Sequence, residues 1–393
     1  MRPLAGITVV TLEHAIAAPF ATRQLADLGA RVIKVERPGV GDFARGYDER
    51  VRGLASHFVW TNRSKESLTL DVKHPEAQTI LKRLVQEQAD VVIQNLAPGA
   101  AARLGLSWEA LSPAKPGLIV CDISGYGTDG PYRDKKAYDL LIQSEAGFLS
   151  ITGTPEEPSK AGLPIADIAA GMYAYSRILA ALLQREKTGL GQHMDISMLE
   201  SLVEWMGYPL YYAFDGAAPP PRTGASHATI YPYGPFPAGD GKTVMLGLQN
   251  EREWGAFCAK VMLQPDLATE PRFASNSKRS AAREELRVLI IRAFAALSAD
   301  EVLRRLDDAQ IANAQVNDMH DVWQHPQLRA RKRWREIDSP SGRIPALLPP
   351  GSWDDQEPRM DCVPALGQHT DAILASLGLS ADAIAGLRQA RAI

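Results

Sequence analysis

The feature that most constrains the fold is an alternation of short β-rich runs and helical patterns over the first 120 residues. Strands are predicted at 7–10, 31–35, 91–93 and 118–120, with helices at 19–28 and 75–88. Strands that alternate with helices indicate a parallel sheet, because a parallel connection needs a crossover. The sequence therefore predicts an α/β fold with a doubly wound, Rossmann-like parallel sheet.

The pattern changes after about residue 205. Three consecutive prolines at 219–221 interrupt it, and a hairpin is predicted in which Asp240 and Gly241 form the turn before a strand at 243–246. Helices are expected near 250–262, 279–297, 299–308 and 369–391. We therefore expect a large α/β domain over 1–205, a linker over 206–225, a smaller α+β domain over 226–330, and a C-terminal return over 331–393 that packs on the large domain.

Composition narrows the class of protein. The chain has 393 residues, a net charge of -3 and 45% hydrophobic residues, which is ordinary for a soluble globular enzyme and favours neither nucleic acid nor a membrane as partner. No segment is expected to reach the ~20 apolar residues of a membrane span, and no signal-type run is expected at the N-terminus. Cys121, Cys258 and Cys362 are too widely spaced for a metal site or a disulfide framework and fit a reducing cytoplasm. We expect a cytoplasmic protein with no metal and no tightly bound cofactor. A nicotinamide-dependent dehydrogenase is excluded, because no G-x-G-x-x-G follows the first strand.

A single acidic residue, Asp167, stands at the start of a long, nearly all-apolar helical segment that ends near Gly189. A helix that is apolar on most faces is usually buried, so this carboxylate is expected to be partly desolvated at a helix N-terminus that favours its charge. One interpretation is a helix cap, which contributes about 1 kcal/mol. The other is a functional carboxylate. The local sequence leaves both open.

Motifs spread along almost the whole chain decide between these interpretations. They cover residues 3–7, 18–20, 25–30, 32–36, 62–65, 70–73, 89–92, 95–99, 124–131, 187–192 and 367–371. In their order and spacing they resemble the class III CoA-transferases, also called the CaiB/BaiF or formyl-CoA transferase family. The resemblance implies that Asp167 is the catalytic nucleophile, forming an aspartyl anhydride and then an aspartyl-CoA thioester.

The same resemblance implies a set of coenzyme A contacts. His14, Ala15 and Ile16 are expected in the pantetheine and thioester pocket. Phosphate and adenine contacts are expected from Arg37, Lys73, Arg103 and Lys136. Leu70, Asn95, Leu96 and Tyr138 are expected to line the same cleft. Backbone N–H groups near Gly125 to Gly127 are a hypothetical oxyanion site.

Departures from well-known family members affect the expected substrate. Oxalate-using members have a glutamine where this chain has Ile16, and a glycine-rich loop that is missing from the second domain. Tyr138 stands where the related α-methylacyl-CoA racemases have a catalytic histidine, and tyrosine is a weak base with a pKa of about 10. The transferase interpretation is therefore favoured over a racemase-like isomerase. A CoA-binding protein without turnover is a further alternative, which would not need an acid at position 167.

Residues 222–233 and 247–254 resemble members that use dicarboxylic acids. They indicate transfer from succinyl-CoA to an acid such as mesaconate or itaconate. Intramolecular transfer within a C5 diacid-CoA is an open alternative. A distal carboxylate needs a cation or a donor cluster, and the candidates are Arg45, Arg52, Arg222 and His227. The resemblance also implies an interlocked homodimer.

Overall fold

The computed structural model describes residues 1–351 and 356–393. The chain divides into two compact units. The first unit comprises residues 1–148, 161–208 and 328–393, and the second comprises 149–160 and 209–327. Each unit has a hydrophobic core of its own.

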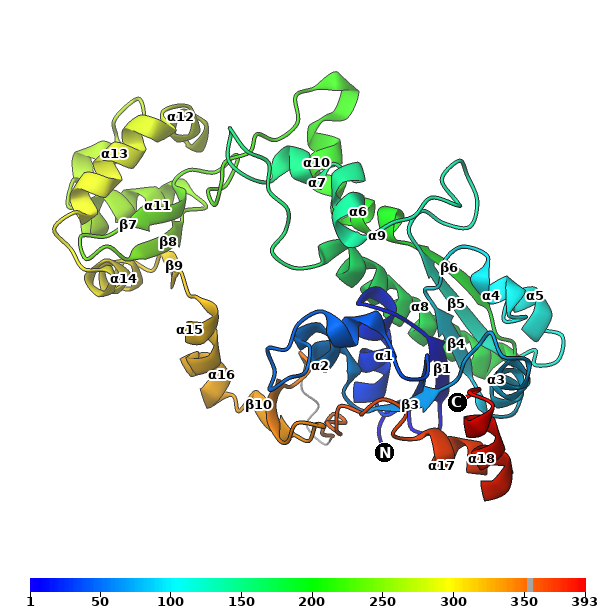
Figure 1. The fold of residues 1–393 in the computed structure, drawn as a ribbon. Coiled ribbons are helices and arrows are strands. Elements are labelled where there is room, and N and C mark those ends of the chain that lie inside the picture. The colour runs from blue at the N-terminus through cyan, green and yellow to red at the C-terminus, as the bar shows by residue number, and fades with distance from the viewer. Residues whose placement is uncertain (352–355) are drawn as a thin grey trace. The chain divides into compact units, whose positions relative to one another are not determined.

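A six-stranded parallel sheet forms the centre of the first unit (Figure 1). Its strand order is β3-β2-β1-β4-β5-β6, the order of a doubly wound dinucleotide-type fold. The predicted α/β class with a parallel sheet is therefore confirmed. The strands are β1 (Thr8–Leu12), β2 (Arg31–Glu36), β3 (Lys65–Thr69), β4 (Val91–Gln94), β5 (Ile119–Ser124) and β6 (His193–Ser197).

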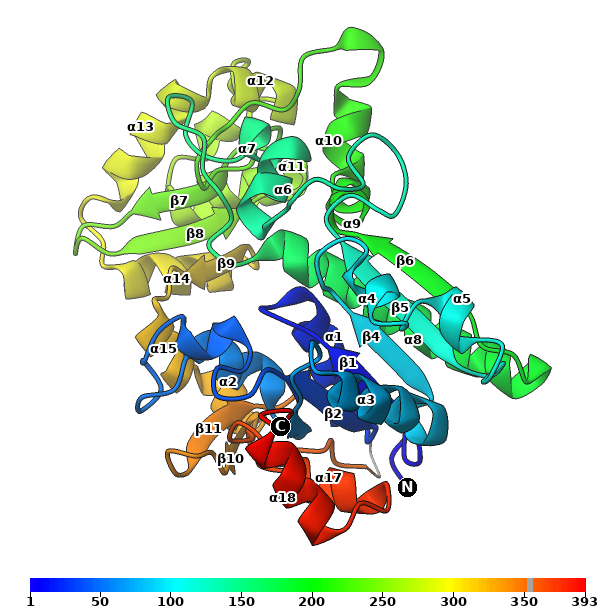
Figure 2. The same ribbon diagram turned by 45° about the vertical axis from the view of Figure 1, so that its right-hand side comes forward.

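Helices cover both faces of this sheet (Figure 2). Side chains alternate across a strand, so Val9 and Val10 enter different cores. Val9 packs in the core that contains α1 (Ala17–Asp27) and α8 (Ile165–Thr188). Val10 packs in the core that contains α3 (Pro75–Gln88), α17 (Thr370–Ser376) and α18 (Ala381–Gln389). The C-terminal helices thus complete one face of the sheet.

Helix α8 corrects the expectation that no segment is long and apolar enough to cross a membrane. It has 24 residues and a mean hydropathy of 1.2 over an 18-residue window, so by length and composition alone it could cross a membrane. In the structure, 44% of that window is buried within the chain, and α8 packs against α1 in the core. A core helix and a membrane span satisfy the same sequence test, because both are apolar on most faces.

Shorter elements complete the first unit. They are η1 (Phe43–Gly46), α2 (Ser56–Asn62), α4 (Ala100–Arg103), α5 (Trp108–Leu111), α6 (Asp139–Glu145), α9 (Met198–Trp205) and the antiparallel pair β10 (Trp334–Ile337) and β11 (Ile344–Leu347). Helices α7 (Phe148–Ile151), α10 (Gly207–Tyr212) and α16 (Pro326–Ala330) lie where the chain passes between the units.

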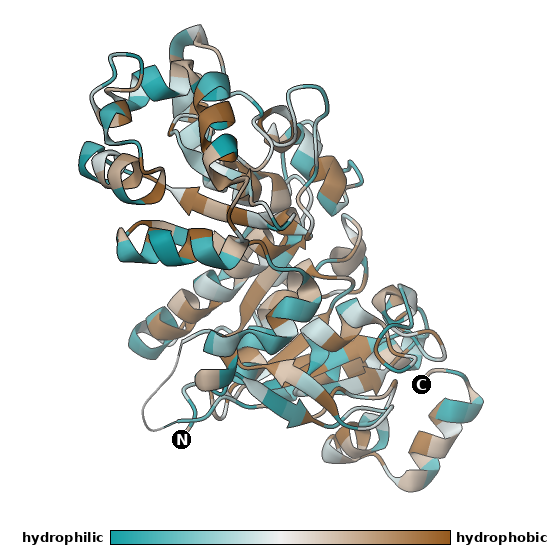
Figure 3. Cartoon of the chain, turned by 90° about the vertical axis from the view of Figure 1, so that its left-hand side faces the viewer, coloured by the Kyte–Doolittle hydropathy of each residue, from teal (hydrophilic) through white to brown (hydrophobic). Residues whose placement is uncertain are grey.

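The second unit contains a three-stranded antiparallel sheet of β7 (Tyr233–Pro237), β8 (Thr243–Gly247) and β9 (Ala312–Gln315). Strands β7 and β8 confirm the hairpin predicted around Asp240 and Gly241. Its helices carry hydrophilic and apolar residues on different faces (Figure 3), and the apolar faces cover the sheet. They are η2 (Phe214–Gly216), α11 (Glu251–Ala256), η3 (Phe257–Val261), η4 (Pro265–Ala268), α12 (Asn276–Ala281), α13 (Arg283–Phe294), α14 (Ala299–Asp308) and α15 (Met319–Gln324).

Candidate active site

The strand order of the large sheet reverses between β1 and β4, and the two segments that follow these strands meet there. The backbone N–H of His14 donates to Asn95 Oδ1 at 2.8 Å, and Asn95 Nδ2 donates to the carbonyl of His14 at 2.9 Å. Ligands of doubly wound sheets bind in the crevice at such a reversal, beyond the carboxyl ends of the strands. Two residues predicted from the sequence are therefore brought together at the expected place.

Asp42 holds the loop at 14–16 in its conformation. Its Oδ1 accepts from the backbone N–H of Ala15 at 3.1 Å and from that of Ala44 at 2.9 Å. Ala15 has a φ of 59°, a left-handed conformation that is uncommon for residues other than glycine. The fixed carboxylate offsets this local strain, so the loop is pre-formed.

A buried ionic network lies behind Asp42. Lys34 Nζ donates to Asp42 Oδ2 at 2.7 Å and approaches Glu13 Oε1 at 3.4 Å, and Lys65 Nζ donates to the same oxygen of Glu13 at 2.6 Å. All four side chains are buried. Burial alone would raise the pKa of Glu13, but the charges of Lys65 and Lys34 outweigh burial and lower that pKa. The network gives the loop a rigid, charge-compensated base.

Four cations expected to contact coenzyme A follow the carboxyl ends of strands β2 to β5. They are exposed, and none forms an ion pair within residues 1–351 and 356–393: Arg37, Lys73, Arg103 and Lys136. Because the carboxyl ends of parallel strands meet at one edge of a sheet, these charges lie along the edge that also carries Asn95. Cations without protein partners suit the phosphates of coenzyme A.

The remaining predicted contacts are placed differently. The side chain of Leu70 is 1% exposed and packs in the core, so only its backbone is available to a ligand. Leu96 is half-buried against the same core. Ile16 is buried at the start of α1, whereas Tyr138 is 69% exposed just before α6. Leu70, Leu96 and Ile16 therefore pack against the core, whereas the Tyr138 side chain is exposed.

Asp167 lies in the first turn of α8, where two helix N-termini meet. The backbone N–H of Ala17, the first residue of α1, donates to its carboxylate. The α8 turn itself is capped by Asp139, whose Oδ1 accepts from the N–H of Ala166 at 2.8 Å and from that of Asp167 at 3.3 Å. The Asp167 side chain is therefore not the helix cap, because another carboxylate has that role.

The surroundings of Asp167 oppose its ionisation. Burial, followed by the negative charge of Asp139, raises the pKa of Asp167 to about 7, although the Ala17 N–H acts in the opposite direction. A carboxylate that is desolvated but still ionised near neutral pH is a stronger nucleophile than one in water. The arrangement therefore suits a covalent role.

Close packing of α8 on α1 depends on Gly171. A Cβ atom at this position would lie 2.7 Å from the carbonyl oxygen of Ala17 and 3.0 Å from Phe20 Cδ1. Only glycine allows the two helices to approach this closely, one turn after Asp167. The sequence contains this glycine, but its partner could not be identified without the structure.

The hypothetical oxyanion site at 125–127 loses one of its donors. The N–H of Gly127 donates to Ser124 Oγ at 2.9 Å and is therefore occupied by the turn. The glycine at 125 has a packing role, since a Cβ there would lie 2.2 Å from Ala137 Cβ. The turn and the close packing of this segment therefore account for the glycines at 125 and 127.

The arginines suggested for a distal carboxylate have structural partners. Arg45 binds both oxygens of Glu36 at 2.8 Å. The Arg52 side chain donates to the carbonyl of Arg343 at 2.9 Å, and Arg222 donates to the carbonyls of Thr154 and Pro155. The fourth candidate, His227, accepts at Nδ1 from two backbone N–H groups of its own loop. The sequence could not reveal the partners of Arg52 and Arg222, because these lie far away along the chain.

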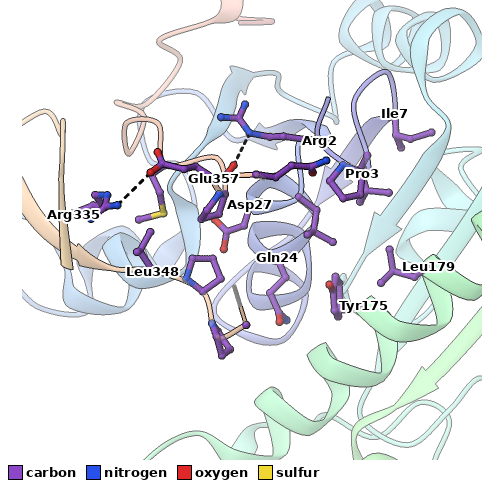
Figure 4. A pocket seen from close by; sticks show the side chains of 18 of the residues that line it. Arg2, Pro3, Ile7, Gln24, Asp27, Tyr175, Leu179, Arg335, Leu348 and Glu357 are labelled. Carbon is purple, nitrogen blue, oxygen red and sulfur yellow. Dashed lines mark hydrogen bonds and ion pairs between the residues drawn. The ribbon is translucent and has the colours of Figure 1, made fainter. Parts of the chain in front are cut away.

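A cavity in the first unit is separate from Asp167. It has a volume of about 1050 Å³ and is lined by the N-terminal segment, α1, the outer face of α8 and the β10–β11 region (Figure 4). Tyr175 and Leu179 of α8 face Pro3 and Leu348 across it. Size alone would mark this cavity as the site, but the free cations and the desolvated carboxylate lie elsewhere. We therefore assign the site to the edge of the sheet.

The first unit thus combines a doubly wound sheet, exposed cations along its carboxyl edge and a desolvated carboxylate. A profile described as "CoA-transferase family III" matches residues 4–370, and the chain belongs to this family. It is 34% identical over 386 residues to a succinate–glutarate CoA-transferase of Agrobacterium fabrum, covering 95% of this chain and 96% of the relative. It is also 34% identical over 353 residues to a succinyl-CoA:mesaconate CoA-transferase of Haloarcula marismortui, covering 86% and 87%.

A solved structure agrees with this assignment. A CaiB/BaiF family protein from Brucella suis superposes with a TM-score of 0.85 at 34% identity, covering 96% of this chain and 99% of that one. The fold of the whole chain is therefore that of the family. The protein is a CoA-transferase.

Proposed function

We propose that this enzyme transfers CoA from succinyl-CoA to a C4 or C5 dicarboxylic acid, with Asp167 as the nucleophile. The observation that carries the proposal is the position of Asp167: its carboxylate is desolvated, bound by the Ala17 N–H and located on the edge that holds the free cations. Relatives named for glutarate and mesaconate support the substrate class. Mesaconate, itaconate and glutarate are the acceptors we would test first.

The reaction follows from one carboxylate and one thioester. Asp167 attacks the thioester carbonyl, the C–S bond breaks, and a mixed anhydride and CoA thiolate form. The thiolate then attacks the aspartyl carbonyl of the anhydride, which releases succinate and leaves an aspartyl-CoA thioester. The acceptor carboxylate repeats these steps in reverse order, so no net proton or electron is gained or lost. Partial exclusion of water protects the anhydride from hydrolysis.

A transfer assay tests this proposal. The purified protein is incubated with succinyl-CoA and each acid in turn, as wild type and as Asp167→Asn. New thioesters from the wild type alone, together with hydroxylamine-sensitive labelling of the peptide that contains Asp167, would support the proposal. Full activity in Asp167→Asn would refute the assignment of the nucleophile. Exchange of the α-proton of a branched acyl-CoA without transfer would favour the racemase-like alternative.

We also propose that the enzyme is a homodimer in which a second copy of the chain occupies the cavity of Figure 4. The outer face of α8 carries exposed apolar side chains, including Met172 at 36% and Leu183 at 67% exposure. A contiguous apolar face on a cavity of this size is typical of an interaction surface, and the family resemblance implies an interlocked dimer. Light scattering after gel filtration should give twice the chain mass for the wild type. Leu183→Glu should shift the protein towards the monomer.

A further inference from the structure

A run of ring side chains leads away from the loop at 14–16. His14 stacks on Phe43 with ring centres 5.2 Å apart and planes inclined by 19°. Phe43 contacts Tyr47 at 5.8 Å, and Tyr47 meets His57 edge-on at 5.4 Å with planes inclined by 90°. Phe43 and Tyr47 are about half exposed. The first unit therefore presents an accessible aromatic wall that ends at an imidazole.

At the far end of this aromatic wall, His57 lies beside Asp48, whose carboxylate is held by three hydrogen bonds. Asp48 accepts from the N–H groups of Arg50 and Ser56 at 2.9 Å each, and from Ser56 Oγ at 2.6 Å. These bonds, the Ser56 hydroxyl first, lower the pKa of Asp48 to about 2. The Asp48 carboxylate lies 3.8 Å from His57 Nδ1, so a fixed carboxylate stands beside this side of the ring.

The other ring nitrogen of His57 is available to a ligand. Its Nε2 has no hydrogen-bond partner within the described ranges 1–351 and 356–393, and the side chain is 42% exposed. The Nε2 atom of an imidazole ring can carry a proton and donate it in a hydrogen bond to a ligand. Such a donor suits an incoming carboxylate.

This donor lies near the proposed reaction centre. His14, where the wall begins, is three residues from Ala17, whose N–H binds the Asp167 carboxylate. Tyr47 is close enough to Asp167 for the charge of that residue to contribute, after burial and Asp42, to raising the pKa of Tyr47 to about 12. The wall therefore connects the nucleophile with His57.

We propose that His57, oriented by Asp48 and flanked by Tyr47, binds the distal carboxylate of the dicarboxylic substrate. The arginines suggested from the sequence are engaged in structural contacts. His57 instead combines an accessible position, a nearby fixed carboxylate and a ring nitrogen with no partner among residues 1–351 and 356–393. The inference rests on the proposed CoA transfer and specifies its substrate subsite. It assigns the selectivity for diacids to this histidine.

The test compares glutarate with glutaramate, in which a neutral amide of the same shape replaces one carboxylate. In His57→Leu, kcat/KM for glutarate should fall about 10- to 100-fold, the usual effect of losing a hydrogen bond to a charged group. The value for glutaramate should stay within about twofold. His57→Gln retains one donor and should lie between the two. The ratio of the two substrates is the readout, because a purely structural defect would lower both values together.

His320→Leu is the matched control, since His320 is also the second residue of a short helix and is exposed. It should leave the glutarate-to-glutaramate ratio unchanged. An unchanged ratio in His57→Leu would overturn the inference. If the wild type transfers CoA to no acid, the proposed function fails on its own. Calorimetric titration of glutarate in the presence of CoA then tests the subsite: weaker binding to His57→Leu than to wild type supports it, and equal binding refutes it.

Discussion

Replacement of Asp139 by asparagine tests how far the charge of Asp139 raises the pKa of the proposed nucleophile, Asp167. Asp139 holds the first turn of α8 through Oδ1, and its charge is the second cause, after burial, of the raised pKa of Asp167. Asparagine retains a carbonyl oxygen for the same N–H groups but removes the charge. The pKa of Asp167 should therefore fall while the helix start remains in place.

The magnitude follows from the charges involved. With a pKa of about 7 for Asp167, half of the wild-type enzyme has an ionised nucleophile at pH 7 and about one tenth at pH 6. Two like charges near a protein surface interact by about 1 to 4 kcal/mol at short range, and about 1.4 kcal/mol corresponds to one pH unit. We expect the midpoint of the rate–pH profile to fall by about one unit in Asp139→Asn.

The assay is kcat/KM for succinyl-CoA between pH 5 and 9. Wild-type rates should rise with a midpoint near pH 7, and the variant should reach its plateau at lower pH. Gln143→Leu is the control, because Gln143 Nε2 donates to Asp139 Oδ2 at 2.6 Å. It removes this bond but keeps the charge, so its midpoint should stay near pH 7. Equal midpoints for Asp139→Asn and wild type would refute the electrostatic argument.

Four further outcomes are expected. Gly171→Ala should lower kcat at least about tenfold and destabilise the fold by about 1–3 kcal/mol, because the added methyl separates α1 from α8. Steady-state kinetics and urea unfolding measure these effects, and a variant that behaves like the wild type would contradict the expectation. Lys65→Met should destabilise by about 3–5 kcal/mol, since Glu13 is left buried with an incomplete set of partners; urea unfolding measures the loss, and a loss under 1 kcal/mol would count against the network. Arg103→Glu should raise KM for succinyl-CoA about tenfold at low salt and less at high salt; a KM independent of salt would remove this residue from the phosphate site. Asp167→Asn should be more stable than wild type by about 2–4 kcal/mol at pH 8 but not at pH 4. The pKa of Asp167 is higher in the folded than in the unfolded state, so its ionisation destabilises the wild-type fold as the pH rises between these two pKa values. Thermal unfolding of both proteins at pH 4 and pH 8 tests this expectation.

Local patterns predicted strands β1, β2, β4 and β5 and the helix that carries Asp167, but they did not predict β3 and β6. The runs at 31–35 and 91–93 are short and apolar, and they form β2 and β4 as expected. The pairing of His14 with Asn95 was not visible in the sequence, but the family resemblance made both candidates, and each follows a strand. These residues illustrate the part of a site that strand order determines.

Other parts of the site depend on contacts between distant segments. Asp139 accepts from the N–H of Ala166, which is 27 residues later in the first turn of α8, so no capping pattern in the sequence could reveal this contact. Arg45 and Arg222 were plausible ligands until their structural partners were known. His57 was overlooked because a lone histidine near the start of a short helix has no distinguishing pattern. Side-chain partners are chosen by tertiary packing, which periodicity does not encode.

The two hydrogen bonds accepted by Asp42 Oδ1 have a consequence for how the enzyme handles successive substrates. One oxygen anchors both the loop at Ala15 and the turn at Ala44 that presents Phe43 and Tyr47. Because one oxygen holds both segments, a ligand that keeps either segment in place also favours the native position of the other. In the proposed reaction the outgoing and incoming acids would use the pocket in turn. Between the two acids, the aspartyl-CoA thioester would remain bound and would hold the aromatic wall in place while no acid is bound there.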